Sequence, residues 1–473
     1  MNATKRILQN TLAQIIGKAI SVGLAVFTLA LMARYLGVEQ FGWYTTTITY
    51  LQMFGIFIDF GLTLVTTQML SEMGAQEERL AKNILGLRLL SALIFFGLAI
   101  AMVWFFPYPP LVKIASIFTS LSFIFIAVNQ VFVGVLQRHL SMWWGSLAEN
   151  ISRVVMLAGI LLVITVDAGF LWVMGIIVIG GGAQTLTLLI TSSCFIKLGL
   201  KFEIAIWKKI ITRSWPIAIC IVFNLVYLRG DLFVMSLVRT QTEVGLYGAA
   251  FRVIDVINTV PFMIMGVVLP LLTQAWSSKN KELFNHYLQQ AFNMLVFISV
   301  PTAFGGMILS EKIMGLVGGP EFISAGGYLK IILLAVIGVY AGAAFSHAII
   351  AVNEQKKTIW IYAVNAIIAV VSYIIFIPRF GAWAAAIITA VNEILVPLMV
   401  TIVLWRLTKF SINLHTFWKI LFASAIMALL IWPLQEKPLW VPLLAGIVIY
   451  SIGVLGLKIV QPKALLSLLR AKA

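Results

Sequence analysis

The sequence predicts an all-α, polytopic membrane protein with about 14 transmembrane helices. Of the 473 residues, 61% are hydrophobic and only 11% are charged, whereas a soluble domain keeps about a quarter of its residues charged. The apolar residues come in long stretches, and the connections between them are too short to hold a soluble domain. A bilayer is therefore the main solvent. A soluble protein with one large core is excluded, because such cores stop growing near about 250–300 residues.

Each apolar stretch of about 20 residues is interpreted as one membrane-crossing helix. The first stretch lacks a small-residue cleavage site and continues into a full-length span, so we expect a retained helix rather than a signal peptide. The expected helices are, in order, residues 12–33, 41–66, 84–106, 111–136, 146–166, 169–196, 214–238, 244–274, 289–309, 327–352, 358–377, 381–405, 414–433 and 438–459.

The distribution of basic residues sets the expected orientation. With a cytoplasmic N-terminus, most of the 33 lysines and arginines fall in cytoplasmic loops, as the positive-inside rule requires. The clearest of these loops runs from Lys197 to Arg213. We therefore expect a multi-pass protein of the cytoplasmic (inner) membrane, surrounded by membrane lipids, with both termini in the cytoplasm. The net charge of +16 is spread over many short loops, so no nucleic-acid partner is indicated.

A short repeat suggests two related halves. Phe41-Gly42-Trp43-Tyr44 opens the second expected helix, and Val244-Gly245-Leu246-Tyr247 opens the eighth. The two motifs are six helices apart and have the same orientation, as in transporters built from parallel repeats with a site between them. We expect two six-helix bundles in a pseudo-two-fold arrangement, at residues 1–200 and 201–406. Two further transmembrane helices would occupy residues 407–473.

Polar residues form a stripe on each of the first two helices. Ionisable groups in a membrane normally face a protein interior or a water-filled cavity, whereas hydroxyls also hold helices together. A cavity is favoured for Lys18 and Asp59, and helix–helix contact for the threonines. The first stripe comprises Gln14, Lys18, Ser21 and Thr28, and the second comprises Thr45, Thr49, Gln52, Asp59, Thr63 and Thr66.

Further charged residues occur in later helices. Glu149 precedes Arg153 by four residues, the favourable order for a pair on a helix, and a structural pair or a cavity role is equally open. Arg229 and Asp231 face different sides of one helix, so each needs a partner elsewhere. Arg252 shares a helix face with Asp255, and the two partly neutralise each other.

The charged residues define a candidate site for an anionic cargo. Lys18, Arg153, Arg229 and Arg252 are the candidate cargo-binding residues, because arginine can hold a phosphate through two parallel hydrogen bonds. Three acids are candidates for coupling transport to H⁺ or Na⁺, namely Asp59, Asp255 and Glu393. For Glu393, which lies near the middle of its helix, a titrating group or a simple ion pair is equally open.

Several common sites are absent from the sequence. It has no Gly-x-x-x-x-Gly-Lys-Ser/Thr loop for a nucleotide. Its four histidines are scattered, and Cys194 and Cys220 suggest neither a disulfide framework nor a metal site. No long outer loop carries the paired acids of a membrane glycosyltransferase. We expect no cofactor, no metal and no enzymatic activity.

Three regions of the chain carry a further set of motifs. The first comprises Ala33–Gly37, Phe41–Tyr44 and Gly55–Leu62, the second is Asp231–Pro270, and the third comprises Gly319–Phe322, Asn353–Lys356, Ile377–Ala385 and Glu393. In this order the three regions resemble the polysaccharide transporter family, and the resemblance covers essentially the whole chain. This family contains the Wzx-type oligosaccharide (O-antigen repeat unit) flippases of the multidrug/oligosaccharidyl-lipid/polysaccharide (MOP) exporter superfamily.

The resemblance implies a flippase that works by alternating access. Its cargo would be a polyprenyl-(di)phosphate-linked oligosaccharide for surface polysaccharide such as lipopolysaccharide, held by basic residues in a central cavity. By helix position these are Lys18, Arg153, Arg229 and Arg252, with a lysine in the first helix as a departure. Polysaccharide polymerase and chain-length proteins are implied partners. The alternatives are a cation-coupled multidrug exporter, a flippase for the peptidoglycan lipid precursor, and a polymerase partner that transports nothing.

Overall fold

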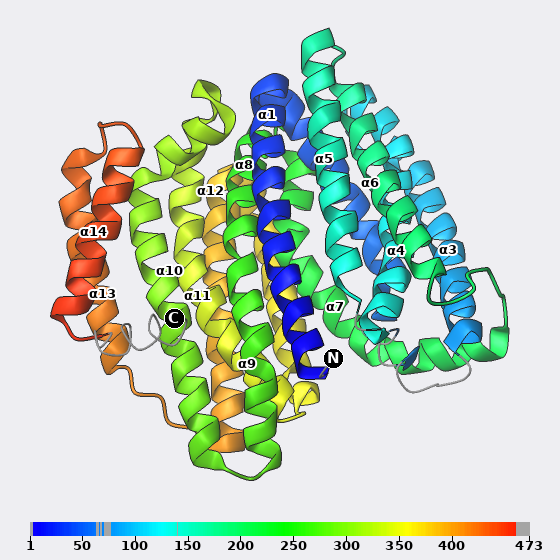
Figure 1. Ribbon diagram of the computed structural model, residues 1–473. Helices are drawn as coiled ribbons and strands as arrows, with labels where there is room; N and C mark the ends of the chain where they lie inside the picture. Colours follow the sequence, from blue (N-terminus) through cyan, green and yellow to red (C-terminus); the bar gives the residue numbers. More distant parts are fainter. Residues whose placement is uncertain (1–2, 63–65, 67–68, 71–76, 140, 460–473) are drawn as a thin grey trace. The chain divides into compact units, whose positions relative to one another are not determined.

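The computed structural model describes residues 3–62, 66, 69–70, 77–139 and 141–459, and every regular element among them is a helix (Figure 1). The predicted all-α membrane class is confirmed. The α-helices are α1 (Ala3–Asp59), α3 (Glu77–Met102), α4 (Pro110–Arg138), α5 (Trp143–Val166), α6 (Phe170–Ser193), α7 (Ile204–Val238), α8 (Gln241–Ile257), α9 (Thr259–Ser277), α10 (Lys281–Gly318), α11 (Ala325–Ala351), α12 (Ile359–Thr408), α13 (His415–Ile431) and α14 (Trp440–Gly456). Short 3₁₀ turns lie at Val103–Phe105, Pro320–Phe322, Gln355–Thr358 and Trp432–Leu434.

Within the residues that the structure describes, eleven helical segments are long and apolar enough to cross a membrane. Two of them, α1 with 57 residues and α12 with 50, are far longer than the roughly 20 residues that one crossing needs. Each contains one glycine with a positive φ, Gly37 at 65° and Gly381 at 60°, where the helix is interrupted. Counting each of these two as two crossings, and adding the shorter apolar helix α14, gives the predicted fourteen.

Two predicted boundaries differ from the structure. We expected a loop at residues 34–40, but the helical backbone continues through it and only Gly37 departs. We expected the second span to run to residue 66, but α1 ends at Asp59 because Phe60 and Gly61 both have positive φ. Asp59 is therefore the last residue of a helix and not a mid-helix residue.

The chain divides into two compact units. The first unit contains Met1–Gly248 and the short segment Ile377–Gly381, and the second contains Ala249–Phe376 and Ala382–Ala473. In the first unit α1, α3, α4, α5 and α6 pack on one another, and in the second α10 packs against both α11 and α13. The predicted division into six-helix halves rests on the sequence repeat and stays a prediction.

The two repeated motifs meet inside the first unit. A Cβ atom added at Gly42 would overlap the carbonyl oxygen of Gln241, and one at Gly245 would overlap the carbonyl oxygen of Val38. Thr46 Oγ1 also donates to Gln241 Oε1 at 2.7 Å. The glycines of the repeat are therefore required by the close approach of α1 and α8, since any side chain would push the two backbones apart.

At two prolines of the second unit, a tyrosine hydroxyl bonds the backbone carbonyl that the proline leaves without a helical partner. Pro261 and Pro301 have no N–H, so the carbonyl oxygens four residues earlier lose their helical partners. The hydroxyl of Tyr340 donates to Ile257 O at 2.8 Å, and that of Tyr450 donates to Phe297 O at 2.9 Å. In an apolar environment an unsatisfied carbonyl is costly, so these hydroxyls link α11 to the break between α8 and α9 and link α14 to α10.

Candidate functional site

Lys18 and Arg153, two of the predicted cargo-binding residues, are brought together by one acid. Lys18 Nζ lies 2.9 Å from Glu149 Oε1, and Ser21 Oγ donates to the same oxygen at 2.8 Å. Arg153 Nη2 lies 3.8 Å from this oxygen. We call the residues Lys18, Ser21, Glu149 and Arg153 the Glu149 cluster. The predicted pairing of Glu149 with Arg153 is confirmed, and the stronger pairing with Lys18 was not anticipated.

The packing of α1 against α5 builds this cluster. The amide of Asn150, the residue directly after Glu149, donates to the carbonyl oxygen of Gly17 at 3.1 Å. This bond fixes the register of the two helices, so that Lys18 and Ser21 of α1 both face Glu149. Thr28, which shares the predicted stripe, instead donates to Leu24 O of its own helix at 2.8 Å.

Asp59, a predicted ion-coupling acid, faces an arginine that the sequence analysis did not single out. Arg88 Nη2 lies 3.2 Å from Asp59 Oδ1, and Arg88 Nη1 donates to Ala127 O at 3.3 Å. The Arg88 side chain is 1% exposed. An acid at the C-terminal end of a helix is disfavoured by the helix dipole, and the Arg88 guanidinium that faces the carboxylate offsets this cost.

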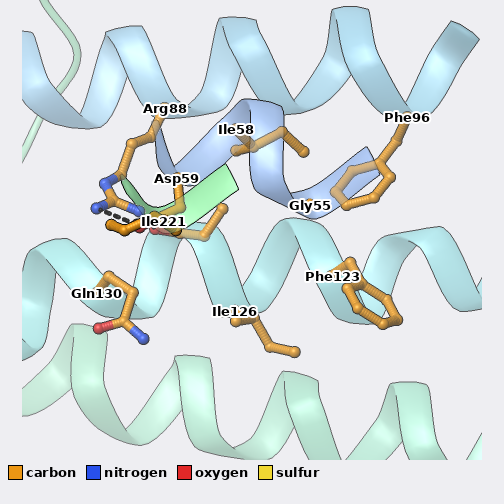
Figure 2. A pocket seen from close by; sticks show the side chains of 10 residues that line it. Gly55, Ile58, Asp59, Arg88, Phe96, Phe123, Ile126, Gln130 and Ile221 are labelled. Atoms are coloured by element: carbon orange, nitrogen blue, oxygen red, sulfur yellow. Dashed lines mark hydrogen bonds and ion pairs between the residues drawn. The ribbon is translucent and has the colours of Figure 1, made fainter. Parts of the chain in front are cut away.

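A cavity of about 390 Å³ adjoins this pair (Figure 2). Figure 2 shows Arg88 and Asp59 facing each other near Gln130, with Phe96 and Phe123 at the opposite end. The cavity is thus polar at one end and apolar at the other. Arg88 could have been noticed in the sequence as the one charge among leucines at residues 84–90, but its position near the start of a span resembled an ordinary positive-inside residue.

Thr45, the first threonine of the second predicted stripe, behaves as a packing residue. Thr45 donates to Phe41 O of its own helix at 2.9 Å, and a Cβ added at Gly248 would lie 2.6 Å from Thr45 Cγ2. The Thr45 side chain on α1 therefore packs closely against α8, as the helix-contact interpretation predicts. Thr63 lies outside the described residues.

The other predicted site residues lie on α7, α8 and α12. Arg229 is half-buried. Asp231 is fully buried and accepts hydrogen bonds from the Tyr247 hydroxyl at 2.6 Å and from the Leu232 backbone N–H at 2.7 Å. The predicted partner of Asp231 is thus the tyrosine of the second repeated motif.

On α8, Arg252 Nη1 lies 3.4 Å from Asp255 Oδ2, which confirms the predicted neutralising pair. Glu393 is half-buried on α12, four residues before Pro397. Among the described residues, no three histidine, cysteine or acidic side chains gather into a group that could hold a metal ion.

Known structures share the fold. One is the structure of a lipid II flippase, MurJ, in an inward closed conformation; it superposes with a TM-score of 0.80 at 19% identity, over 93% of this chain and 97% of that chain. Another is an inward-facing multidrug resistance MATE family transporter of the MOP superfamily, with a TM-score of 0.67 at 13% identity, over 84% of this chain and 98% of that chain. At such identities the likeness shows the fold alone.

Sequence comparisons identify the protein family. A curated relative, the probable low-salt glycan biosynthesis flippase Agl15 of Haloferax volcanii, is 27% identical over 168 residues, and the match covers 34% of each chain. The match therefore spans about a third of that relative's length. The MatE family model matches residues 216–378. The model of the polysaccharide biosynthesis protein family matches residues 7–276, more than half of the chain, and the chain belongs to this family.

Proposed function

We propose that the protein is a flippase that moves a polyprenyl-(di)phosphate-linked oligosaccharide across the cytoplasmic membrane for surface polysaccharide synthesis. The observation that carries this proposal is the Glu149 cluster, in which two cations share a single acid within membrane-spanning helices. A net positive, partly exposed site in this setting attracts an anionic head group, because the low-dielectric surroundings strengthen the attraction. Membership of the polysaccharide biosynthesis family supports the glycan cargo.

In the proposed mechanism the diphosphate enters from the cytoplasmic side and binds Lys18 and Arg153. Arg229 and Arg252 are the further candidates for contact with the head group. The sugar and phosphate then cross through the polar interior while the lipid tail stays in the bilayer. Alternating access by the two halves releases the sugar on the other side.

Resetting of the protein is proposed to use a proton or Na⁺ at Asp59, Asp255 or Glu393. The geometry makes Asp59 less suited than Asp255. A proton on Asp59 would remove the carboxylate charge that faces the buried Arg88, and weakening the ion pair of a buried arginine is unfavourable. Asp255 pairs with Arg252, whose side chain is 21% exposed, so its titration affects a less deeply buried cation.

The test is a flipping assay in liposomes. Purified protein is reconstituted with a fluorescent polyprenyl-diphosphate sugar, and the label reached by a membrane-impermeant quencher is followed over time against protein-free liposomes. We expect protein-dependent flipping that falls roughly tenfold or more in Lys18→Ala or Arg153→Ala, since a charge-assisted hydrogen bond is worth about 1.5–3 kcal/mol. Lys356→Ala, an exposed lysine on the turn Gln355–Thr358, is the matched control and should keep wild-type flipping.

The same assay examines Arg252. We expect Arg252→Ala to abolish flipping and Arg252→Lys to recover part of it, because lysine keeps the charge and loses the fork of donors. No flipping by folded wild-type protein under any proton, sodium or voltage gradient would refute the proposed function.

A flippase for the peptidoglycan lipid precursor is the second candidate, favoured by the fold shared with the lipid II flippase structure over 93% of this chain. Deletion of the gene separates the two. Loss of the peptidoglycan flippase is lethal, whereas loss of a surface-polysaccharide flippase leaves viable cells without the polysaccharide.

A further inference from the structure

We propose that Glu149 is a displaceable counter-ion that occupies the place of a cargo phosphate oxygen while the site is empty. This inference rests on the proposed function and adds a residue that sets cargo affinity and release. Its starting point is that one atom, Glu149 Oε1, accepts hydrogen bonds from two groups of α1 and is also the ion-pair partner of Arg153 on α5. Lys18 and Ser21 of α1 approach it at 2.9 and 2.8 Å, and Arg153 of α5 lies at 3.8 Å.

The arrangement is the one that a phosphate oxygen would find. A lysine ammonium, a serine hydroxyl and an arginine guanidinium converge on a single anionic oxygen, and all three groups donate hydrogen bonds to phosphate in proteins. A carboxylate oxygen carries a similar but smaller negative charge. Glu149 therefore keeps the cations in position without satisfying them fully.

Arg153 is the incompletely satisfied member of the cluster. Its 3.8 Å separation from Glu149 Oε1 exceeds the 2.7–3.2 Å of a hydrogen bond. Within the part of the chain that the structure describes, its buried Nε atom has no hydrogen-bond partner. A guanidinium has five N–H donors in a fork that matches two oxygens of a phosphate. Arg153 thus has donor capacity that Glu149 does not use.

The two cations of the cluster are also accessible, unlike Arg88, which is 1% exposed. The side chains of Lys18 and Arg153 are 43% and 35% exposed, and that of Glu149 is 24% exposed. A ligand can therefore reach both cations without unfolding the helices. Two positive charges and one negative charge leave the empty cluster with a net charge of +1.

These features give Glu149 two opposing effects on transport. A diphosphate carries more negative charge than one carboxylate, so it displaces Glu149 from Lys18 and Arg153. Glu149 then lies beside the bound anion and repels it, which lowers affinity and speeds release on the other side. Removing the charge of Glu149 should therefore strengthen cargo binding and slow turnover.

The first experiment measures the binding of inorganic pyrophosphate to full-length detergent-purified protein by titration calorimetry. We expect Glu149→Gln to bind pyrophosphate about tenfold more tightly than wild type and Glu149→Asp to bind it nearly as the wild type does. The matched control is Glu203→Gln, because Glu203 also lies between an arginine and a lysine, Arg79 and Lys201, but outside the cluster. The control should leave pyrophosphate affinity unchanged.

The second experiment is the flipping assay. We expect Glu149→Gln to reach half-saturation at a lower cargo concentration and to show a lower maximal rate, a split that simple loss of structure does not produce. Unchanged or weaker pyrophosphate binding in Glu149→Gln, with binding still lost in Lys18→Ala, would overturn the role of Glu149 and leave the proposed site intact. Pyrophosphate affinity that is the same in wild type, Lys18→Ala and Arg153→Ala would overturn both.

Discussion

Two ion clusters in the first unit have nearly the same components and opposite properties. The pair of Arg88 and Asp59 is balanced in charge, and its cation Arg88 is 1% exposed. The Glu149 cluster has one cation in excess, and its charged side chains are 24–43% exposed. Intramembrane charge alone therefore does not mark a binding site. A balanced pair with a buried cation holds helices together, whereas a cluster with an excess of accessible cations can bind a ligand.

The largest expected effect on stability is from Arg88→Met. Removing the guanidinium takes away the cation that lies 3.2 Å from Asp59 at the end of α1, and breaking an ion pair with a buried member costs up to about 3–5 kcal/mol. Thermal unfolding in detergent measures this loss. The double variant Arg88→Met/Asp59→Asn should recover much of it, because no charge is then stranded. If the single variant were as stable as the wild type, the pair would not stabilise the fold. The contrast with the Glu149 cluster would then be wrong.

Arg153→Met should reduce flipping strongly and stability only slightly. Glu149 keeps Lys18 and Ser21 as partners, so we expect stability to fall by less than about 1 kcal/mol, as for a partly exposed ion pair. Flipping should nevertheless fall roughly tenfold or more, since a cargo contact is lost. Unfolding and flipping are measured on the same preparation. A large loss of stability with proportionate loss of flipping would place Arg153 in the same class as Arg88.

A smaller loss of stability is expected when an uncharged hydrogen bond beside a proline is removed. Tyr340→Phe removes the donor to Ile257 O and should cost about 1–2 kcal/mol, the range for an unsatisfied buried acceptor. Pro261→Ala restores an N–H that can bond the same carbonyl, so the double variant should be more stable than Tyr340→Phe alone. A double-mutant cycle followed by thermal unfolding tests this coupling. Additive losses would show that the tyrosine does not serve the proline kink.

The smallest effect is expected at Glu203, in a cluster outside the membrane spans. Arg79 Nε donates to Glu203 at 3.0 and 3.1 Å, and Asn83 Nδ2 donates at 3.1 Å. These bonds from Arg79 and Asn83 lower the pKa of Glu203 from 4.5 to about 2. A depressed pKa gives stability that is present above pH 4.5 and is lost as the pH falls toward 2.

The Glu203→Gln variant tests that pH dependence. Its deficit in unfolding temperature relative to wild type should be small at pH 6 and should shrink as the pH is lowered toward 2. A deficit that grew on acidification would contradict the assignment of the low pKa to the folded state. The result measures how much an acid between an arginine and a lysine stabilises the protein outside the membrane spans. It can then be compared with the two clusters inside the spans.

The sequence predicted two of the ion pairs and missed a third. Glu149 and Arg153 were paired correctly because a spacing of four residues places side chains together on a helix. Arg252 and Asp255 were paired because a spacing of three residues does the same, and the contact is 3.4 Å. Asp59 was recognised as costly in a membrane, but Arg88, 29 residues away in sequence, was not recognised as its partner. Local spacing determines the first two pairs and says nothing of the third.

The sequence by itself determined that the protein is a membrane protein, that it has fourteen expected crossings, and which charges lie within them. These properties follow from hydropathy and from the cost of a charge in hydrocarbon, and both depend only on residues close together in the chain. Only the tertiary structure decided that Lys18 binds Glu149, 131 residues later, and that Tyr340 closes the kink at Pro261. Those contacts depend on which helices pack side by side and in what register, and many registers would bury the same apolar faces equally well.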